Sequence, residues 1–500
     1  MTTKIIDSYK AHPLRHRAHA ITGWLPITLI LIAATGLFLY QLGYEGLWLD
    51  ELNSVRDIDM PLTDVYKSNR VRPLYYLLLL FWSQFGESDA WLRSLSVVFA
   101  VVSLFLLYRL GRRLIGEKEG LLAATLLALS PEFIHHAQEI RMYAVSLCLG
   151  LAGTLFLSNA LLVDRDQVPK QKTLAGWALF RLLAIYTVPL NITLLLPDAL
   201  IVLSRFRRQS AVLINFARWT LWILALWAPS VLSVVEASSP SSNYAYDHSG
   251  AVPPGPDRLI RPLKFLTVWP FSVQSNKVVA LFYKLFTLLI AGLVGAGLIR
   301  RHKSPVLLWT FAWLLLPLLP IVTFSYLLIP IWQTRYLVFV SPYLFILLAA
   351  GLARLWQDWR PAAMAIAAVY LIAVSGGLVH YYTVQQRPDY KFNVATVAQY
   401  EQPGDAIIWS YECCTSGLRR YYHGSQAVYE LSTHQVKTEE DVQRWINRLP
   451  NGHERLWLIL GTSEQIGTQI ERQAASLYTV ERSFDYERGT KVLLLSDKPE

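Results

Sequence analysis

The chain has 500 residues, of which 53% are hydrophobic, 13% aromatic and only 16% charged, and its mean hydropathy is +0.32. This composition is too apolar for a soluble enzyme of this length and predicts a polytopic α-helical membrane protein. The formal net charge of +10 is explained by orientation in a membrane, so no nucleic-acid partner is needed.

Apolar runs long enough to cross a bilayer recur from residue 21 to residue 380, whereas residues 385–500 carry charge at ordinary density. We therefore expect a membrane domain over residues 1–384 and a soluble domain over residues 385–500. The first run is too long for the apolar part of a cleaved signal peptide, so it is a retained helix. About eleven transmembrane helices are predicted, over residues 21–43, 92–111, 120–134, 141–163, 174–190, 191–204, 212–235, 278–299, 305–326, 335–354 and 361–380.

Basic residues orient these helices, because loops rich in Lys and Arg remain cytoplasmic. With a cytoplasmic N-terminus, the loops 44–91 and 236–277 and the C-terminal domain lie outside a plasma membrane of bacterial type. Two predicted spans are weak, since residues 174–204 give short crossings and include Arg181. Five basic clusters then fall on the cytoplasmic face: Arg112-Arg113 with Lys118, Lys170 with Lys172, Arg205–Arg208, Arg300–Lys303, and Arg354 with Arg360.

The first outside loop contains an apolar run, Pro73–Phe85, of about 13 residues. That length is too short to span a bilayer and is typical of a helix that lies in the membrane interface. The loop therefore brings polar residues close to the outer membrane surface.

Polar side chains gather in three of the predicted outside loops. Asp50 and Glu51 follow the first span, and Glu139 and Arg141 lie in the second outside loop. A carboxylate can accept a proton from a hydroxyl group, while an arginine can hold a phosphate through two hydrogen bonds. Each group alone is also consistent with a solvated loop, an interfacial ion pair or a helix-end anchor. A third group precedes the tenth span and consists of Gln333, Arg335 and Tyr336.

The order of short motifs along the chain resembles that of the GT-C glycosyltransferases, and most closely the bacterial relatives of protein O-mannosyltransferases and aminoarabinose transferases. These motifs are Leu47-Trp-Leu-Asp-Glu51, Pro73-Leu-Tyr-Tyr-Leu77, Arg93-Ser-Leu-Ser96, Tyr108-Arg-Leu-Gly-Arg-Arg-Leu114, Leu129-Ser-Pro131, Gln138-Glu-Ile-Arg-Met-Tyr143 and Gln333-Thr-Arg-Tyr-Leu337. The resemblance covers residues 21 to about 430. It implies transfer of a sugar from a polyprenyl-phosphate carrier to an acceptor on the outer face, with inversion at the anomeric carbon.

The resemblance also implies roles for single residues. Asp50 matches the first-loop acid taken as catalytic, and Glu51 matches its partner. Glu139 and Arg141 match the acidic and basic pair of the second loop, and Arg335 with Tyr336 match residues before a late helix. Arg93 and Gln333, which lie in two of the motifs, are further candidates for substrate binding.

Two departures from the family pattern bear on the site. Arg72 precedes Pro73 where relatives carry a second proline, and it is a further candidate contact for phosphate. Tyr186-Thr-Val-Pro189 stands where many relatives have a histidine after the threonine, which puts in doubt any role of that histidine, including metal binding.

A glycosyl phosphate already carries a good leaving group, so the reaction needs a base and cations but no second acid. We expect Asp50 to be the base and Arg335 and Arg141 to be the cations. Glu51 orients the acceptor or holds a divalent metal; no histidine or cysteine cluster with ligand spacing is found, so no cofactor is assigned. The expected partners are the lipid-linked donor, membrane lipids, and a lipid, protein or polysaccharide acceptor.

The C-terminal domain is predicted to be α/β. Strand-like runs alternate with helix-like stretches, at 406–409, 456–460 and 492–495 for the strands and at 438–449 and 464–475 for the helices. Two other classes of protein fit parts of the chain. A transporter or lipid flippase would favour charges at the membrane midplane and two similar halves, and a receptor or scaffold would leave the first-loop acids without a role.

Overall fold

The computed structural model describes residues 13–162, 168–237, 254–268, 277–299, 305–327, 331–387, 390–411, 416–433, 435–461, 464–486 and 490–498. The predicted basic cluster Arg300–Lys303 and most of the loop 236–277 lie outside these residues. The chain forms two compact units, and it passes between them after residues 40, 68, 75, 93 and 379. Unit 1 consists of residues 1–40, 69–75 and 94–379, and unit 2 of residues 41–68, 76–93 and 380–500.

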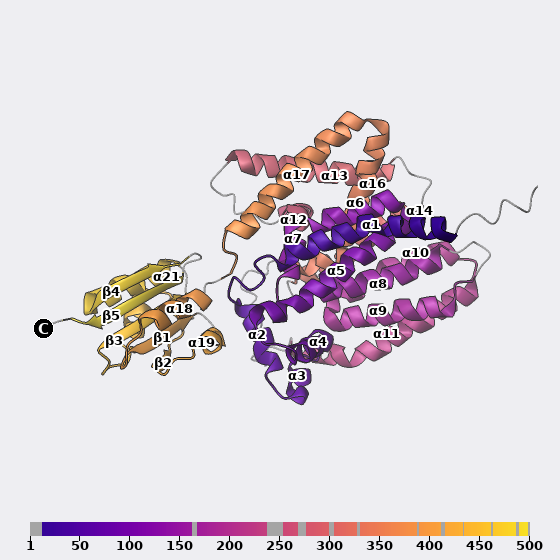
Figure 1. The fold of residues 1–500 in the computed structure, drawn as a ribbon. Helices are drawn as coiled ribbons and strands as arrows, with labels where there is room; N and C mark the ends of the chain where they lie inside the picture. The colour runs from indigo at the N-terminus through magenta and orange to yellow at the C-terminus, as the bar shows by residue number, and fades with distance from the viewer. Residues whose placement is uncertain are drawn as a thin grey trace, which may run out of the picture. The chain divides into compact units, whose positions relative to one another are not determined.

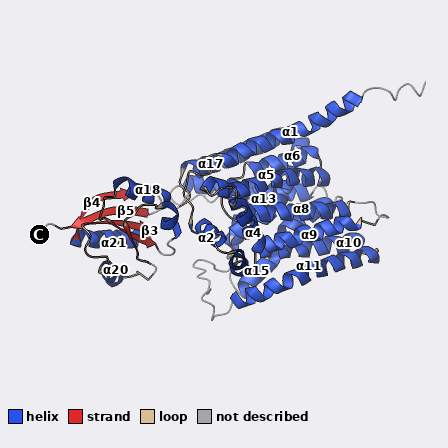
Figure 2. Ribbon diagram, turned by 60° about the horizontal axis from the view of Figure 1, so that its bottom comes forward, coloured by secondary structure: helices blue, strands red, loops and turns tan. Residues whose placement is uncertain are grey.

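Unit 1 is a helical bundle, in which α8, α9, α10 and α11 run side by side (Figures 1 and 2). Its long apolar helices follow the hydropathy of the sequence. The helices that lie wholly or mostly in this unit are α1 (Pro13–Leu39), α5 (Asp89–Leu114), α6 (Glu117–Ala128), α7 (Pro131–Ala137), α8 (Tyr143–Leu161), α9 (Gln171–Thr187), η2 (Pro189–Leu194), α10 (Leu195–Phe206), α11 (Ser210–Ala237), α12 (Pro256–Val268), α13 (Lys277–Ile299), α14 (Pro305–Leu315), α15 (Leu318–Leu327), η3 (Thr334–Val340), α16 (Ser341–Asp358) and α17 (Arg360–Thr383).

Within the described residues, eight helical stretches are long and apolar enough to cross a membrane, and two shorter apolar helices accompany them. The polytopic helical fold is confirmed, but the count of eleven crossings is not. The predicted span 120–134 is wrong as a single helix, because α6 ends at Ala128 and α7 begins at Pro131, where proline removes a backbone donor. The span 305–326 corresponds to the apolar stretch Pro305–Leu327, which is divided into α14 and α15 next to Pro317.

A buried ion pair connects α9 to α10. The carboxylate of Asp198 accepts hydrogen bonds from Arg181 Nε at 2.7 Å and Nη2 at 3.1 Å. It also accepts the indole N–H groups of Trp177 and Trp313, each at 2.8 Å. Arg181 and Asp198 have no exposed surface, so these four hydrogen bonds replace the water that both charges would otherwise bind.

Unit 2 combines the C-terminal part of the chain with residues from the first outside loop. The loop contributes α2 (Leu49–Ile58), α3 (Leu62–Ser68) and most of α4 (Pro73–Ser83), so the apolar run expected at 73–85 is indeed helical. Trp82 and Trp91 stack with their ring centroids 5.1 Å apart, and each indole N–H donates to the carbonyl oxygen of the other residue. These contacts hold the end of α4 against the start of α5.

The strands of the described chain all belong to unit 2, and they form a five-stranded sheet with the order β2-β1-β3-β5-β4 (Figure 1). β1 pairs in parallel with β2 and β3, whereas β5 pairs antiparallel with β3 and β4. The α/β prediction for this region is therefore confirmed. The elements are α18 (Tyr390–Tyr400), β1 (Ala406–Tyr411), α19 (Ser416–Tyr421), β2 (Ala427–Glu430), α20 (Glu439–Ile446), β3 (Arg455–Gly461), α21 (Glu464–Leu477), β4 (Tyr478–Asp485) and β5 (Thr490–Asp497).

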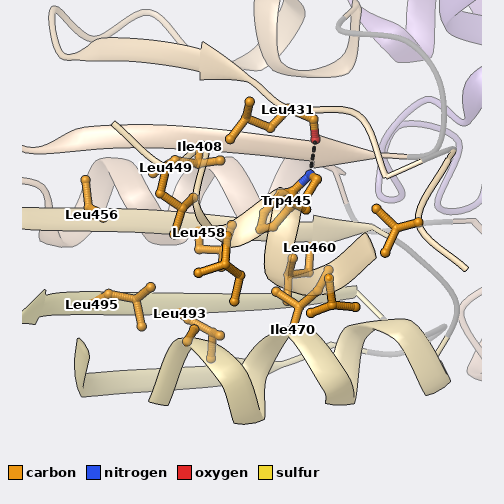
Figure 3. Close-up of a cluster of buried hydrophobic side chains, with 14 of the residues drawn as sticks. Ile408, Leu431, Trp445, Leu449, Leu456, Leu458, Leu460, Ile470, Leu493 and Leu495 are labelled. Carbon is orange, nitrogen blue, oxygen red and sulfur yellow. Dashed lines mark hydrogen bonds between the residues drawn. The ribbon is translucent and has the colours of Figure 1, made fainter. Parts of the chain in front are cut away.

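One apolar core joins this sheet to α20 and α21 (Figure 3). Leu458 and Leu493 from the sheet pack with Trp445 of α20 and Ile470 of α21, and all four side chains are buried. The Trp445 indole N–H donates to the carbonyl oxygen of Leu431 at 3.4 Å, which gives the buried indole a polar partner.

Candidate active site

The first-loop acids lie in the first turn of α2, in unit 2. The side chain of Glu51 has no exposed surface and faces Arg93, with Nε to Oε1 at 2.9 Å and Nη2 to Oε2 at 2.8 Å. Its Oε2 also accepts the backbone N–H of Trp48 at 3.2 Å, and Arg387 Nε lies 3.4 Å away. Glu51 is therefore a fixed carboxylate that closes the N-terminus of α2.

Arg93, a candidate for substrate binding, is fully buried and contacts the chain before α2. Its Nη1 donates to the carbonyl oxygens of Leu42 and Glu45, and its Nη2 donates to that of Gly46 as well as to Glu51. With the Nε bond to Glu51, all five N–H groups of the guanidinium have protein acceptors. Arg93 thus holds the chain before α2 in place, and its part in substrate binding stays a prediction.

Asp50 differs from its neighbour in exposure. Its side chain is half-buried, while its carbonyl oxygen accepts the Ser54 hydroxyl at 2.9 Å within α2. Because Glu51 anchors the first turn, the backbone that carries Asp50 is fixed.

The second-loop acid lies in unit 1, just after the short helix α7. Ser130 begins this helix by accepting the Phe133 N–H at 3.4 Å, and Pro131 occupies its first turn. His136 joins two carboxylates, with Nε2 2.8 Å from Glu132 Oε1 and Nδ1 2.5 Å from Glu139 Oε1. Burial lowers the pKa of His136, but the charges of Glu132 and Glu139 outweigh burial and raise the pKa to about 9. The imidazole is therefore protonated at neutral pH and can donate a hydrogen bond to each of the two side chains.

The same segment contains a group of metal-ligand type. His135, His136 and Glu139 each offer a ligand atom, and these atoms all lie within 4.8 Å of one another. The sequence did not indicate this cluster, because its residues do not have a conventional metal-ligand spacing. The turn at the end of α7 brings the three residues together. A metal ion here would replace the proton between His136 and Glu139 and take imidazole and carboxylate ligands, as zinc and manganese do.

Aromatic rings connect the second loop to the residues before α16. Tyr143 lies beside His136, with ring centroids 4.6 Å apart, and beside Tyr336, with centroids 6.5 Å apart. Arg335 lies over the Tyr336 ring at 5.4 Å, and its Nε donates to Gln333 Oε1 at 2.8 Å. The structure thus brings Glu139, Gln333, Arg335 and Tyr336 into one constellation.

In the sequence, Tyr143 is only the last residue of a motif. In the structure it lies between His136 and Tyr336. Its side chain is buried, and Arg141, Arg335 and Glu139 all lie within Coulombic range of its hydroxyl. Within the described residues, this hydroxyl has no hydrogen-bond partner. A buried polar group without a partner costs about 1–3 kcal/mol, so the site is suited to a ligand that supplies one.

Arg72 is also in unit 1, where it is half-buried and its backbone N–H donates to the Asn69 carbonyl oxygen at 2.9 Å. Its expected contact with phosphate stays a prediction.

Known proteins resemble this chain in part of its sequence and in its fold. Residues 73–232 match the family model described as dolichyl-phosphate-mannose-protein mannosyltransferase. No curated protein sequence matches the chain.

Solved structures share the fold over nearly the whole chain. ArnT from Cupriavidus metallidurans in the apo state matches with a TM-score of 0.57 and 14% identity, covering 95% of this chain and 98% of that one. The same protein bound to undecaprenyl phosphate matches with a TM-score of 0.56 and 13% identity, again over 95% and 98% of the two chains. The Archaeoglobus fulgidus oligosaccharyltransferase tethered with an acceptor peptide gives 0.50 and 10% identity, over 95% of this chain and 74% of that one.

Residues 73–232 are thus similar to the protein mannosyltransferase family, and the chain shares the fold of ArnT over nearly its whole length.

Proposed function

We propose that this protein transfers a sugar from a polyprenyl-phosphate carrier to an acceptor hydroxyl group at the outer face of the membrane, with Asp50 as the general base. The buried Tyr143 hydroxyl, lying close to Arg141 and Arg335, is the observation that carries the proposal, because the site has the chemistry of a phosphate-binding site. The undecaprenyl phosphate bound to ArnT, whose fold the chain shares, supports the same class of donor.

The reaction is a single displacement. The acceptor oxygen attacks the anomeric carbon, Asp50 takes the hydroxyl proton, and the bond from the anomeric carbon to the phosphate oxygen breaks. The carrier leaves as polyprenyl phosphate, and the configuration at the anomeric carbon inverts. Arg141 and Arg335 stabilise the negative charge that grows on the leaving phosphate, and the Tyr143 hydroxyl donates a hydrogen bond to it.

Glu51 has a positioning role in this mechanism. Its carboxylate is held by Arg93, by the Trp48 N–H and by Arg387, so its contacts favour neither a metal ion nor the acceptor as its partner. Glu51 fixes the first turn of α2 and thereby the direction of the Asp50 side chain. Glu139, held by His136, balances the two arginines and orients the donor.

The replacement of Asp50 by Asn tests this proposal. Asn retains the size of the side chain but cannot accept the hydroxyl proton, so we expect turnover to fall about a hundredfold or more, with little change in donor binding. The measurement is release of polyprenyl phosphate from a panel of lipid-linked hexoses and pentoses by protein in liposomes. Asp57→Asn, on the same helix, is the matched control and should retain full activity. Near wild-type turnover in Asp50→Asn would show that Asp50 is not the base. If the wild type moves the intact donor across the bilayer without cleaving it, the flippase alternative is favoured.

The outer-face location is tested by labelling of single cysteines in intact cells. With the N-terminus cytoplasmic, Met60→Cys, Ala245→Cys and Glu440→Cys should all react with a membrane-impermeant maleimide, because loops rich in Lys and Arg stay inside. Lys118→Cys is the control that should react only after the cells are permeabilised. Protection of all three outside positions would reverse the proposed orientation.

A further inference from the structure

A cavity of unit 1 lies at the opposite end of α8 from Tyr143, which is part of the proposed reaction site. Its volume is about 710 Å³, and it is lined by the end of α8, the end of α10 with the following turn, and the start of α14. Three candidate membrane spans end or begin here, at Leu161, Phe206 and Pro305. The cavity is therefore placed where apolar helices meet a membrane surface.

The charged side chains that line the cavity are all basic. Arg205, Arg207 and Arg208 line the cavity, and no acidic side chain is among the lining residues. Arg205 is held in position, since its Nε donates to the Leu161 carbonyl oxygen at 3.1 Å and its guanidinium lies 5.5 Å from the Phe206 ring centroid. Arg207 and Arg208 are exposed. Such a lining favours an anion.

An apolar stripe leads up to these arginines. Leu196, Leu200 and Leu203 are 37%, 47% and 51% exposed, and their spacing places them on one face of α10. Leu308 of α14, which packs against α10, is 52% exposed. The opposite face of α10 is buried and includes Asp198 and Ile201. The exposed leucines face the hydrocarbon of a membrane, so a ligand that contacts both stripe and arginines has an apolar tail and an anionic head.

We propose that this cavity binds the head group of an anionic phospholipid, whose acyl chain lies along the exposed leucines of α10. Charge complementarity selects the anionic head group, and the leucine stripe selects a lipid over a small anion. The inference concerns a site separate from the transfer reaction and does not depend on it. By the positive-inside rule, the lipid belongs to the cytoplasmic leaflet.

Native mass spectrometry of the full-length protein tests this site. Protein released from nanodiscs that contain phosphatidylglycerol and phosphatidylcholine in equal amounts should retain phosphatidylglycerol in preference. Arg207→Gln/Arg208→Gln should lower that retention about tenfold or more, because each arginine near an anionic surface contributes attraction. The control Arg112→Gln/Arg113→Gln removes the same charge from another exposed basic cluster and should leave retention unchanged.

Two further measurements keep the proposal open to refutation. Arg207→Lys/Arg208→Lys retains the charge and should recover most of the binding, which excludes a loss caused by misfolding. Equal retention of the two lipids by the wild type, equal loss in the control variant, or displacement of the lipid by millimolar inorganic phosphate would each overturn the phospholipid site; the last result would indicate a site for small anions.

Discussion

Glu51 of unit 2 and Glu139 of unit 1 are both buried carboxylates in loops of the proposed outer face, but their partners differ. Glu51 pairs with a guanidinium, which stays charged at any pH the protein meets. Glu139 pairs with an imidazole, whose charge depends on pH. The first pair is thus a permanent part of the fold, whereas the second can lose its cation.

Burial also separates Glu51 from the adjacent acid Asp50, to which the proposed mechanism gives a different task. Glu51 is fully enclosed and holds α2, which leaves the half-exposed Asp50 as the acid of that pair able to meet a substrate. Glu139 is held by His136, whose charge depends on pH, and the proposed mechanism places it beside the donor. The next three predictions test this contrast, beginning with the largest effect.

Removing the cation of the first pair should destabilise the protein severely. Arg93→Met removes the two closest hydrogen bonds of the buried Glu51 and leaves it Arg387, at 3.4 Å, as a cation. Breaking a buried pair in this way costs about 3–5 kcal/mol, so the yield of folded protein should collapse. Size-exclusion chromatography in detergent measures this loss. The double variant Arg93→Met/Glu51→Met removes both charges and should recover part of the yield. Normal yield and thermal stability for Arg93→Met would show that the pair does not stabilise the fold.

Arg335→Lys should reduce activity with the fold intact. Lysine keeps the charge but loses the planar fork that binds two phosphate oxygens, so we expect turnover to fall about ten- to a hundredfold. Arg354→Lys, a conservative change on α16 away from the constellation, is the matched control. Full turnover of Arg335→Lys at saturating donor would return Arg335 to the role of a helix-end anchor.

The smallest effect is a pH dependence of stability. The pKa of His136 is raised above its unfolded value by Glu132 and Glu139, so its stabilising contribution is complete below about pH 6.5, declines as pH rises, and is lost above about pH 9. The unfolding temperature of the wild type should therefore exceed that of His136→Asn by a few degrees at pH 6 and converge with it near pH 10. His423→Asn, a change at an exposed histidine, should show no such trend. If the two unfolding temperatures differ by the same amount at every pH, then His136 stabilises the protein by packing and not by its charge.

Hydropathy and short motifs were sufficient to predict the helical membrane fold and the α/β region, because both signals are local. The buried runs of β1 and β3 were recognised for this reason. β2 and β4 were missed, since β2 has four residues and both strands are largely exposed. The breaks at Pro131 and Pro317 were also missed, because apolar residues continue on either side of them.

The candidate residues were easier to find than their partners. Glu51 and Arg93 are 42 positions apart, and no local pattern indicates that one encloses the other. The contacts of His136 with Glu132 and Glu139 depend on the turn of α7 and could not be predicted from the sequence. The position of Tyr143 beside Tyr336 depends on the packing of α8 against η3, which the sequence does not show either. Local sequence thus identified chemistry-bearing positions, while tertiary contacts decided which of them remain accessible.

The Arg181–Asp198 pair also constrains how the protein is made. A single Arg or Asp at the centre of an inserting helix costs about 2.5–3.5 kcal/mol, so α9 or α10 would enter the bilayer poorly by itself. The two residues are 17 positions apart, and only the short segment η2 separates their helices. If they pair before leaving the insertion machinery, each charge is neutralised at the moment of entry. We therefore expect α9 and α10 to be inserted together, as one hairpin, during synthesis of the chain.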